Sequence, residues 1–127
     1  MELAFFLHFV LWSFGPFVFW SLAVQMSFAD FQQSVARAAT PPAGASFALQ
    51  ALWHDARGDW DRAHTCAQED PGRDGAWVHA YLHRKEGDLG NAGYWYARAG
   101  RTMPAQNVTL EAEWAAMATE LLGKNSS

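Results

Sequence analysis

The stretch ALWHDARGDWDRA (Ala51–Ala63) returns 29 residues later as AYLHRKEGDLGNA (Ala80–Ala92). Five residues are identical between the two copies: an alanine, a histidine, the Gly-Asp pair and a final alanine. Glycine adopts the left-handed conformation that ends a helix, and aspartate caps the next helix by accepting its free amide hydrogens. Gly58-Asp59 and Gly87-Asp88 therefore predict two tight turns, each joining two helices into an αα-hairpin.

Helical patterns also flank the two predicted hairpins. The residues before each turn, Phe47–Arg57 and Ala76–Glu86, are predicted to be the first helix of each pair. A short helix is expected over Phe28–Ala38 and is stopped by prolines after Thr40. A last helix is expected after Thr109, ending at Gly123, with a disordered tail over 124–127. The predicted fold is all-α, with two αα-hairpins between flanking helices in one domain over 26–123.

The first 25 residues differ from the rest, since 18 of them are apolar and Glu2 carries their one formal side-chain charge. Three interpretations remain open for this segment. Leu3–Val24 is long enough for a transmembrane helix, Ser27-Phe28-Ala29 would suit a signal-peptide cleavage site, and Met26 would serve as a later translation start. A membrane helix would leave the following domain in the cytoplasm, because the first basic residue, Arg37, lies on its C-terminal side.

The second copy, GDLGNAGYWYARAG (Gly87–Gly100), resembles tetratricopeptide and Sel1-like helical repeats. Gly87, Ala92, Tyr96 and Ala99 stand at that family's relative spacings, although the 29-residue repeat is shorter than the usual 34. The segments Ala51–His64 and Gly75–Gly100 also resemble a small uncharacterised bacterial helical-repeat family, mostly without an apolar leader. The resemblance implies a TPR-like mini-solenoid and no particular activity.

Composition excludes several classes of function. The 127 residues carry 9 basic and 13 acidic side chains, a net charge of −4 with histidine neutral, which argues against a nucleic-acid binder. One cysteine, Cys66, excludes an internal disulfide framework. No nucleophile, phosphate-loop or paired-carboxylate motif is present, so neither a cofactor nor a catalytic residue is predicted.

If the resemblance holds, the first helix of each hairpin lines a shallow groove that binds a protein or peptide partner. Aromatic residues and arginine dominate such contacts energetically, and Arg84 with Lys85 would suit a carboxylate of the partner. The alternative is that Trp77 and Tyr81 pack in the core between helices. The residues expected to line the groove are Leu49, Leu52, Asp55, Trp77, Tyr81, Arg84 and Lys85.

A second hypothesis is a histidine metal site or metal-dependent enzyme. His79 and His83 are four residues apart on one predicted helix, and His54 occupies the place of His83 in the first copy. The competing interpretation is an ordinary polar stripe on a half-buried helix.

Finally, the run Tyr94-Trp95-Tyr96 covers three directions around a helix, so one ring is expected to be exposed and available to a second copy of the chain in a homodimer.

Overall fold

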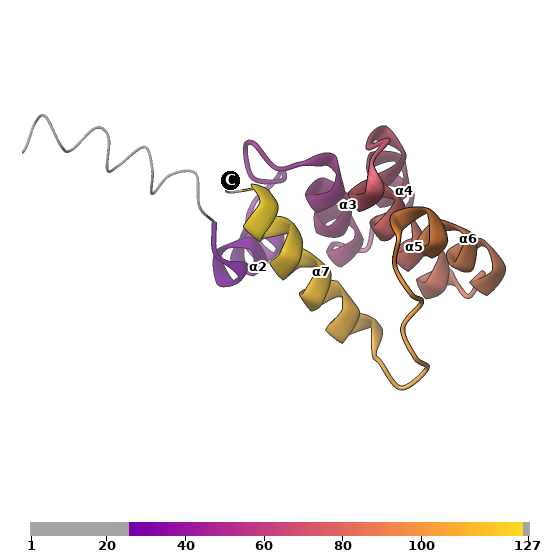
Figure 1. The fold of residues 1–127 in the computed structure, drawn as a ribbon. Coiled ribbons are helices and arrows are strands. Elements are labelled where there is room, and N and C mark those ends of the chain that lie inside the picture. The colour runs from indigo at the N-terminus through magenta and orange to yellow at the C-terminus, as the bar shows by residue number, and fades with distance from the viewer. Residues whose placement is uncertain (1–25, 126–127) are drawn as a thin grey trace, which may run out of the picture.

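A computed structural model describes residues 26–125 of the chain. Within this range the chain forms six α-helices and no strand (Figure 1). Their bounds are α2 Phe28–Arg37, α3 Phe47–Ala56, α4 Trp60–Glu69, α5 Arg73–Glu86, α6 Leu89–Ala99 and α7 Leu110–Asn125. The all-α prediction is therefore confirmed for the described residues. The three interpretations of residues 1–25 lie outside them, and no helix within them has the length and apolarity needed to cross a bilayer.

The two Gly-Asp sites are both helix boundaries, as predicted. Gly58 and Gly87 have φ angles of 82° and 88°, in the left-handed region that glycine adopts without a steric penalty. Asp59 then caps α4 by accepting from the Arg62 amide, and Asp88 caps α6 by accepting from the Asn91 amide. The repeated sequence thus produces the same turn twice, so that α3 and α4 form one helix pair and α5 and α6 the other.

Small residues allow the helices of these pairs to approach closely. The repeated alanines, Ala51 with Ala80 and Ala63 with Ala92, have no solvent-exposed surface. The two pairs also pack against each other through α4 and α5. Near this junction an added Cβ on Gly75 would lie 2.3 Å from the Asp70 carbonyl oxygen, so only glycine fits there.

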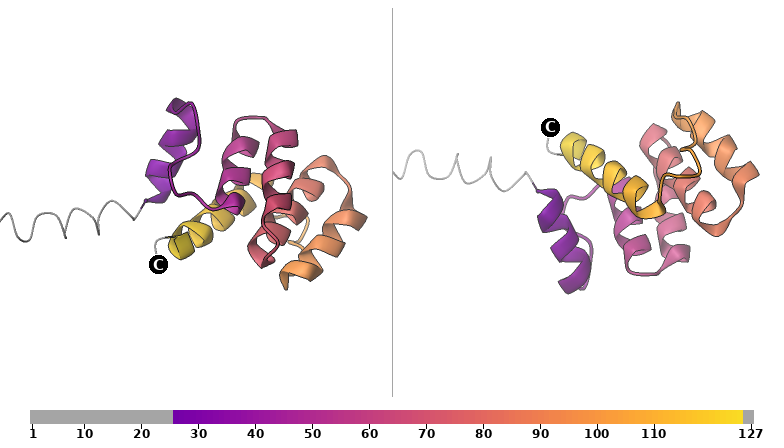
Figure 2. Two further views of the ribbon diagram at one scale, coloured as in Figure 1. Left: turned by 90° about the horizontal axis from the view of Figure 1, so that it is seen from above. Right: turned by 90° about the horizontal axis from the view of Figure 1, so that it is seen from below.

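Helix α7 runs across one side of α2 and the two helix pairs (Figures 1 and 2) and packs on α2, α3 and α5. Met117, Ala118 and Leu121 bury its apolar side. The Trp114 indole nitrogen donates to the Leu52 carbonyl oxygen at 3.0 Å. The last helix is therefore part of the core rather than an appended cap.

Helix α2 is held by aromatic contacts and by hydrogen bonds from α3 and its C-terminal end. Phe31 is fully buried and stacks on Trp114 with ring centroids 5.9 Å apart. Three residues further along the same face of α2, the Ser34 hydroxyl accepts from the Trp53 indole nitrogen at 3.2 Å. The Ser27 side chain caps the start of α2 by accepting from the Asp30 amide.

The predicted end of the last helix is wrong. Helix α7 continues through Gly123 to Asn125, and Gly123 does not take a left-handed conformation. Lys124 pairs with Asp74 at 2.7 Å, and the Asn125 side chain accepts from the Ser46 amide at 3.2 Å. These long-range contacts fix the last turn, so the tail predicted over 124–127 does not begin at Lys124. Residues 126–127 lie outside the described range.

The packing at Gly75 gives a direct test of the junction between α4 and α5. We expect Gly75→Ala to lower the free energy of unfolding by about 1–3 kcal/mol, because the new methyl group overlaps the Asp70 carbonyl. The matched control is Gly90→Ala in α6, where an added Cβ meets nothing within 4 Å. There alanine should raise stability by up to about 1 kcal/mol through helix propensity. Urea unfolding measures both, and an equal gain in both variants would contradict the close approach.

Candidate functional site

The residues predicted to line an open groove are mostly buried. Leu49 and Leu52 belong to the hydrophobic core, as do Trp77 and Tyr81. Asp55 is also buried, with 4% of its surface exposed. The alternative, that these apolar and aromatic side chains pack in the core between helices, is therefore confirmed.

Arg84 is largely covered by α7 and by the loop that precedes it. Its guanidinium forms an ion pair with Glu113 at 2.8 Å and donates to the Val108 carbonyl oxygen at 2.5 Å. The Tyr96 hydroxyl donates to the other Glu113 oxygen at 2.5 Å. Burial and the bond to Glu113 raise the pKa of Tyr96, so its hydroxyl keeps the proton that it donates.

Trp77 is covered from the same direction. The Arg101 guanidinium lies 3.7 Å from the centre of the Trp77 ring, a cation–π contact. Arg101 in turn pairs with Glu120 of α7. The prediction of an open groove is therefore wrong, because α7 and residues 100–109 cover these side chains. Arg84 and Arg101 form their ion pairs with carboxylates of α7 rather than with a partner.

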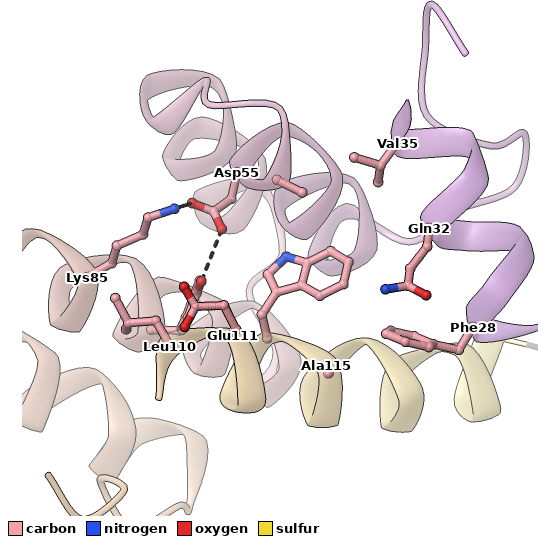
Figure 3. Close-up of a pocket in the computed structure, with 11 residues that line it drawn as sticks. Phe28, Gln32, Val35, Asp55, Lys85, Leu110, Glu111 and Ala115 are labelled. Carbon is pink, nitrogen blue, oxygen red and sulfur yellow. Dashed lines mark hydrogen bonds and ion pairs between the residues drawn. The ribbon is translucent and has the colours of Figure 1, made fainter. Parts of the chain in front are cut away.

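A smaller pocket remains where α2 and α7 diverge, beside the ends of α3 and α5 (Figure 3). Its volume is about 410 Å³. Phe28, Gln32 and Val35 face it from α2, and Leu110, Glu111 and Ala115 face it from α7. The remaining lining residues are Asp55, Ala56, Tyr81, Lys85 and Trp114. Asp55, Tyr81 and Lys85 of the predicted set thus still border a cavity, but Leu49, Leu52, Trp77 and Arg84 do not.

Charged groups cluster at the α5 end of this pocket. Lys85 pairs with Asp55 at 2.9 Å, and the Tyr81 hydroxyl donates to the second Asp55 oxygen at 3.2 Å (Figure 3). Burial, followed by the Asp55 charge, raises the pKa of Tyr81 and keeps it protonated. Glu111 is exposed on the same wall. Since Asp55 already neutralises Lys85, this end of the pocket carries a net negative charge.

The predicted histidine trio is only partly brought together. His79 and His83 stack on one face of α5 with ring centroids 4.8 Å apart, as their spacing predicted. His54 is not with them: it lies on α3, edge-on to Trp53, and burial lowers its pKa. The third member of the cluster is His64 of α4, 4.5 Å from His79 and 5.3 Å from His83 between ring centroids. His54 must therefore be replaced by His64 in any metal hypothesis.

Sequence reasoning missed His64 because its neighbour in the cluster comes from a different helix pair. The signal available was the four-residue step from Trp60 to His64, which places both rings on one face of α4. The two rings do stack, with centroids 4.8 Å apart. Which helix that face contacts is decided by how the first pair packs on the second.

Burial lowers the pKa of two of the clustered imidazoles, His64 and His79. Desolvation, with the neighbouring His64 and His83 charges, lowers the pKa of His79 from 6.5 to about 4. Desolvation is also the first cause of the lowered pKa of His64, and the His83 charge is the second. A neutral imidazole has a lone pair that is free to accept a hydrogen bond or to bind a metal.

The Tyr94-Trp95-Tyr96 run behaves as its pattern predicted. Tyr96 is buried, Trp95 is partly buried and Tyr94 is 55% exposed. Arg98 lies over the Tyr94 ring at 6.0 Å. The homodimer suggested by an exposed ring stays a prediction.

The buried ion pair gives one prediction for how α7 is held. Glu113→Ala should lower the free energy of unfolding by about 3–5 kcal/mol, because it leaves the largely buried Arg84 guanidinium without its carboxylate partner. Glu111→Ala, two residues earlier on an exposed face, should cost less than about 1 kcal/mol. Chemical denaturation compares the two, and similar losses would show that Arg84 and Glu113 do not hold the helix in place.

The lowered pKa of His79 gives a second prediction. Between its unfolded value of 6.5 and its folded value of about 4, the unfolded chain binds more protons at this site. Stability should therefore fall as the pH drops from 6.5 towards 4, by at most about 1.4 kcal/mol per pH unit for this group. The measurement is urea unfolding in chelator at several pH values. His79→Gln should flatten that pH dependence, and an unchanged slope would contradict the assignment.

Comparison of the chain with protein-family models, with curated proteins and with solved structures finds no match. The resemblance to helical repeats therefore stays a prediction. A function for this chain has to be argued from its own pocket and its own side-chain clusters.

Proposed function

We propose that this chain is a non-catalytic helical-repeat module, TPR-like in organisation, that binds a segment of a partner protein. The repeat supports this proposal, because both copies make the same Gly-Asp turn and bury the same small residues. Stacked helix pairs of this kind present surfaces between elements and commonly serve as binding scaffolds. The predicted cytoplasmic location and the predicted homodimer belong to the same proposal, and so does a membrane tether if residues 1–25 form a transmembrane helix.

The observation that carries the proposal is the half-open apolar pocket between α2 and α7. Its volume of about 410 Å³ lies within the range of roughly 300–1,000 Å³ that is usual for ligand pockets. Phe28, Val35, Leu110 and Trp114 line it while remaining only partly buried. A ligand side chain placed there would bury apolar surface that the chain leaves in water, which favours binding.

The charge of the pocket specifies the polar part of the ligand. The sequence favoured a partner carboxylate on Arg84 and Lys85, but both of these cations have carboxylate partners within the chain. Glu111 stands on the pocket wall and forms no ion pair with another residue of the described range 26–125. A basic group next to the apolar side chain therefore fits better than an acidic one. We propose a ligand segment with one large apolar residue flanked by lysine or arginine.

Selection from a random peptide library on the full chain tests this proposal. Enriched peptides should pair an aliphatic or aromatic residue with a lysine or arginine within a few positions. Glu111→Lys should weaken their binding about fivefold in a fluorescence-anisotropy titration, the scale of one exposed charge pair. Glu69→Lys is the matched control, since it makes the same charge change on the exposed surface of α4, outside the pocket.

Three results would contradict the proposal. The first is the absence of any enriched peptide. The second is enrichment of acidic peptides, which would reverse the charge argument. The third is equal weakening by Glu111→Lys and Glu69→Lys, which would trace the effect to net charge rather than to the pocket.

A further inference from the structure

Three histidines from two helices meet at the junction between the helix pairs. His64 comes from α4, and His79 and His83 come from successive turns of α5. One ring nitrogen from each can be chosen so that all three lie within 4.8 Å of one another. His79 and His83 are buried and His64 is partly buried, so the cluster is largely shielded from water.

The surrounding groups orient these rings. The His83 Nδ1 atom lies 2.7 Å from Glu86 Oε1, and a carboxylate can only accept, so Nδ1 carries the proton. The lone pair is then on Nε2, the atom that lies 3.3 Å from the Asn91 side-chain amide. A carboxylate behind a histidine in this way fixes the tautomer and makes the ring a stronger ligand.

Tryptophan rings hold the other two histidines. Trp60 stacks on His64, and Trp95 stacks on His79 with ring centroids 4.0 Å apart. A hollow of about 470 Å³ that borders both His79 and Trp95 connects this region with solvent. His79 is therefore the member of the cluster that borders this hollow.

We propose that His64, His79 and His83 form a binding site for Zn²⁺, with Glu86 positioning His83. Three imidazole nitrogens with no thiolate favour zinc among the common metals over magnesium or calcium, which take oxygen ligands. Zinc–nitrogen bonds of 2.0–2.1 Å in a tetrahedron place the nitrogens about 3.3 Å apart, so the nitrogens, now within 4.8 Å of one another, must close by up to about 1.5 Å. Water or an external group would take the fourth position, as in other three-histidine sites.

The cluster is also a departure from the repeat. Under the 29-residue shift, His83 corresponds to His54, but His79 corresponds to Gln50 and His64 to Gly93. The site therefore arises once, at the interface between the two helix pairs, and is independent of the pocket between α2 and α7. A partner-binding test at that pocket and a metal test here can fail separately.

The experiment is calorimetric titration of Zn²⁺ into the full, untagged chain after removal of metal by a chelator. We expect one equivalent to bind with a dissociation constant of about 1 µM or tighter. His79→Gln/His83→Gln should weaken binding at least about 100-fold. Glu86→Gln should weaken it about tenfold, the usual effect of losing the group behind a histidine ligand.

The matched control is His8→Gln/His54→Gln, which removes the other two histidines of the chain and leaves the cluster intact. It should bind Zn²⁺ like the wild type. Zn²⁺ should also raise the melting temperature of the wild type and of this control, because it binds the folded state. Circular dichroism checks that each variant is folded.

One measurement on the wild type does not depend on any variant folding. In histidine-detected NMR, Zn²⁺ should shift the imidazole signals of His64, His79 and His83 and leave those of His54 in place. Less than about a tenth of an equivalent bound at micromolar protein would overturn the proposal. Equal affinity in the two double variants, or shifts confined to His54 or His8, would overturn it as well.

Discussion

The ion pair between Arg84 and Glu113 fixes α7 against α5 and so determines which side chains of the helix pairs are exposed to solvent. It joins the end of α5 to the first turns of α7, and the Tyr96 hydroxyl adds a third group from α6. Such a pair is stabilising only when its hydrogen bonds are complete, because removing two charges from water is costly. Here the Val108 carbonyl and the Tyr96 hydroxyl complete them. The result is a last helix that is fixed across the helix pairs.

This docking changes the chemistry available for binding. Without α7, the first helices of the two pairs would expose two basic side chains and several large apolar ones. With α7 in place, Arg84 is neutralised and the apolar residues are core. The remaining pocket lies beside Glu111, so its charge is opposite to that of the groove expected from the sequence. Helix α7 therefore covers the groove expected over α3 and α5, and it forms with α2 a pocket that favours a basic rather than an acidic ligand.

The histidine cluster arises in a similar way, from elements that are local in structure but not in sequence. The step from His79 to His83 is a property of one helix, and its outcome was predictable. His64 joins them because α4 packs on α5, which is a relation between the two repeats rather than within one. Trp60 and Trp95 then enclose the imidazoles from both sides. The repeated residues form the two helix pairs, whereas His64 and His79, which have no histidine at the equivalent position of the other copy, form the candidate metal site with His83.

The sequence by itself determined the helices and the turns between them. Gly58 and Gly87 end helices because only glycine takes a positive φ at no cost, and Asp59 and Asp88 restart them because their carboxylates accept amide hydrogens nearby. These are interactions within a few residues, so a local pattern is sufficient to predict them.

The tertiary structure alone decided where α7 docks, which charges are neutralised and which histidines meet. Arg84 and Glu113 are 29 residues apart, and the pairing of Asn125 with Ser46 spans 79. Gly123 remains helical because the turn that follows it is held by such distant partners. A carboxylate or an imidazole has no sequence signature for its partner, since the partner is chosen by how whole helices pack.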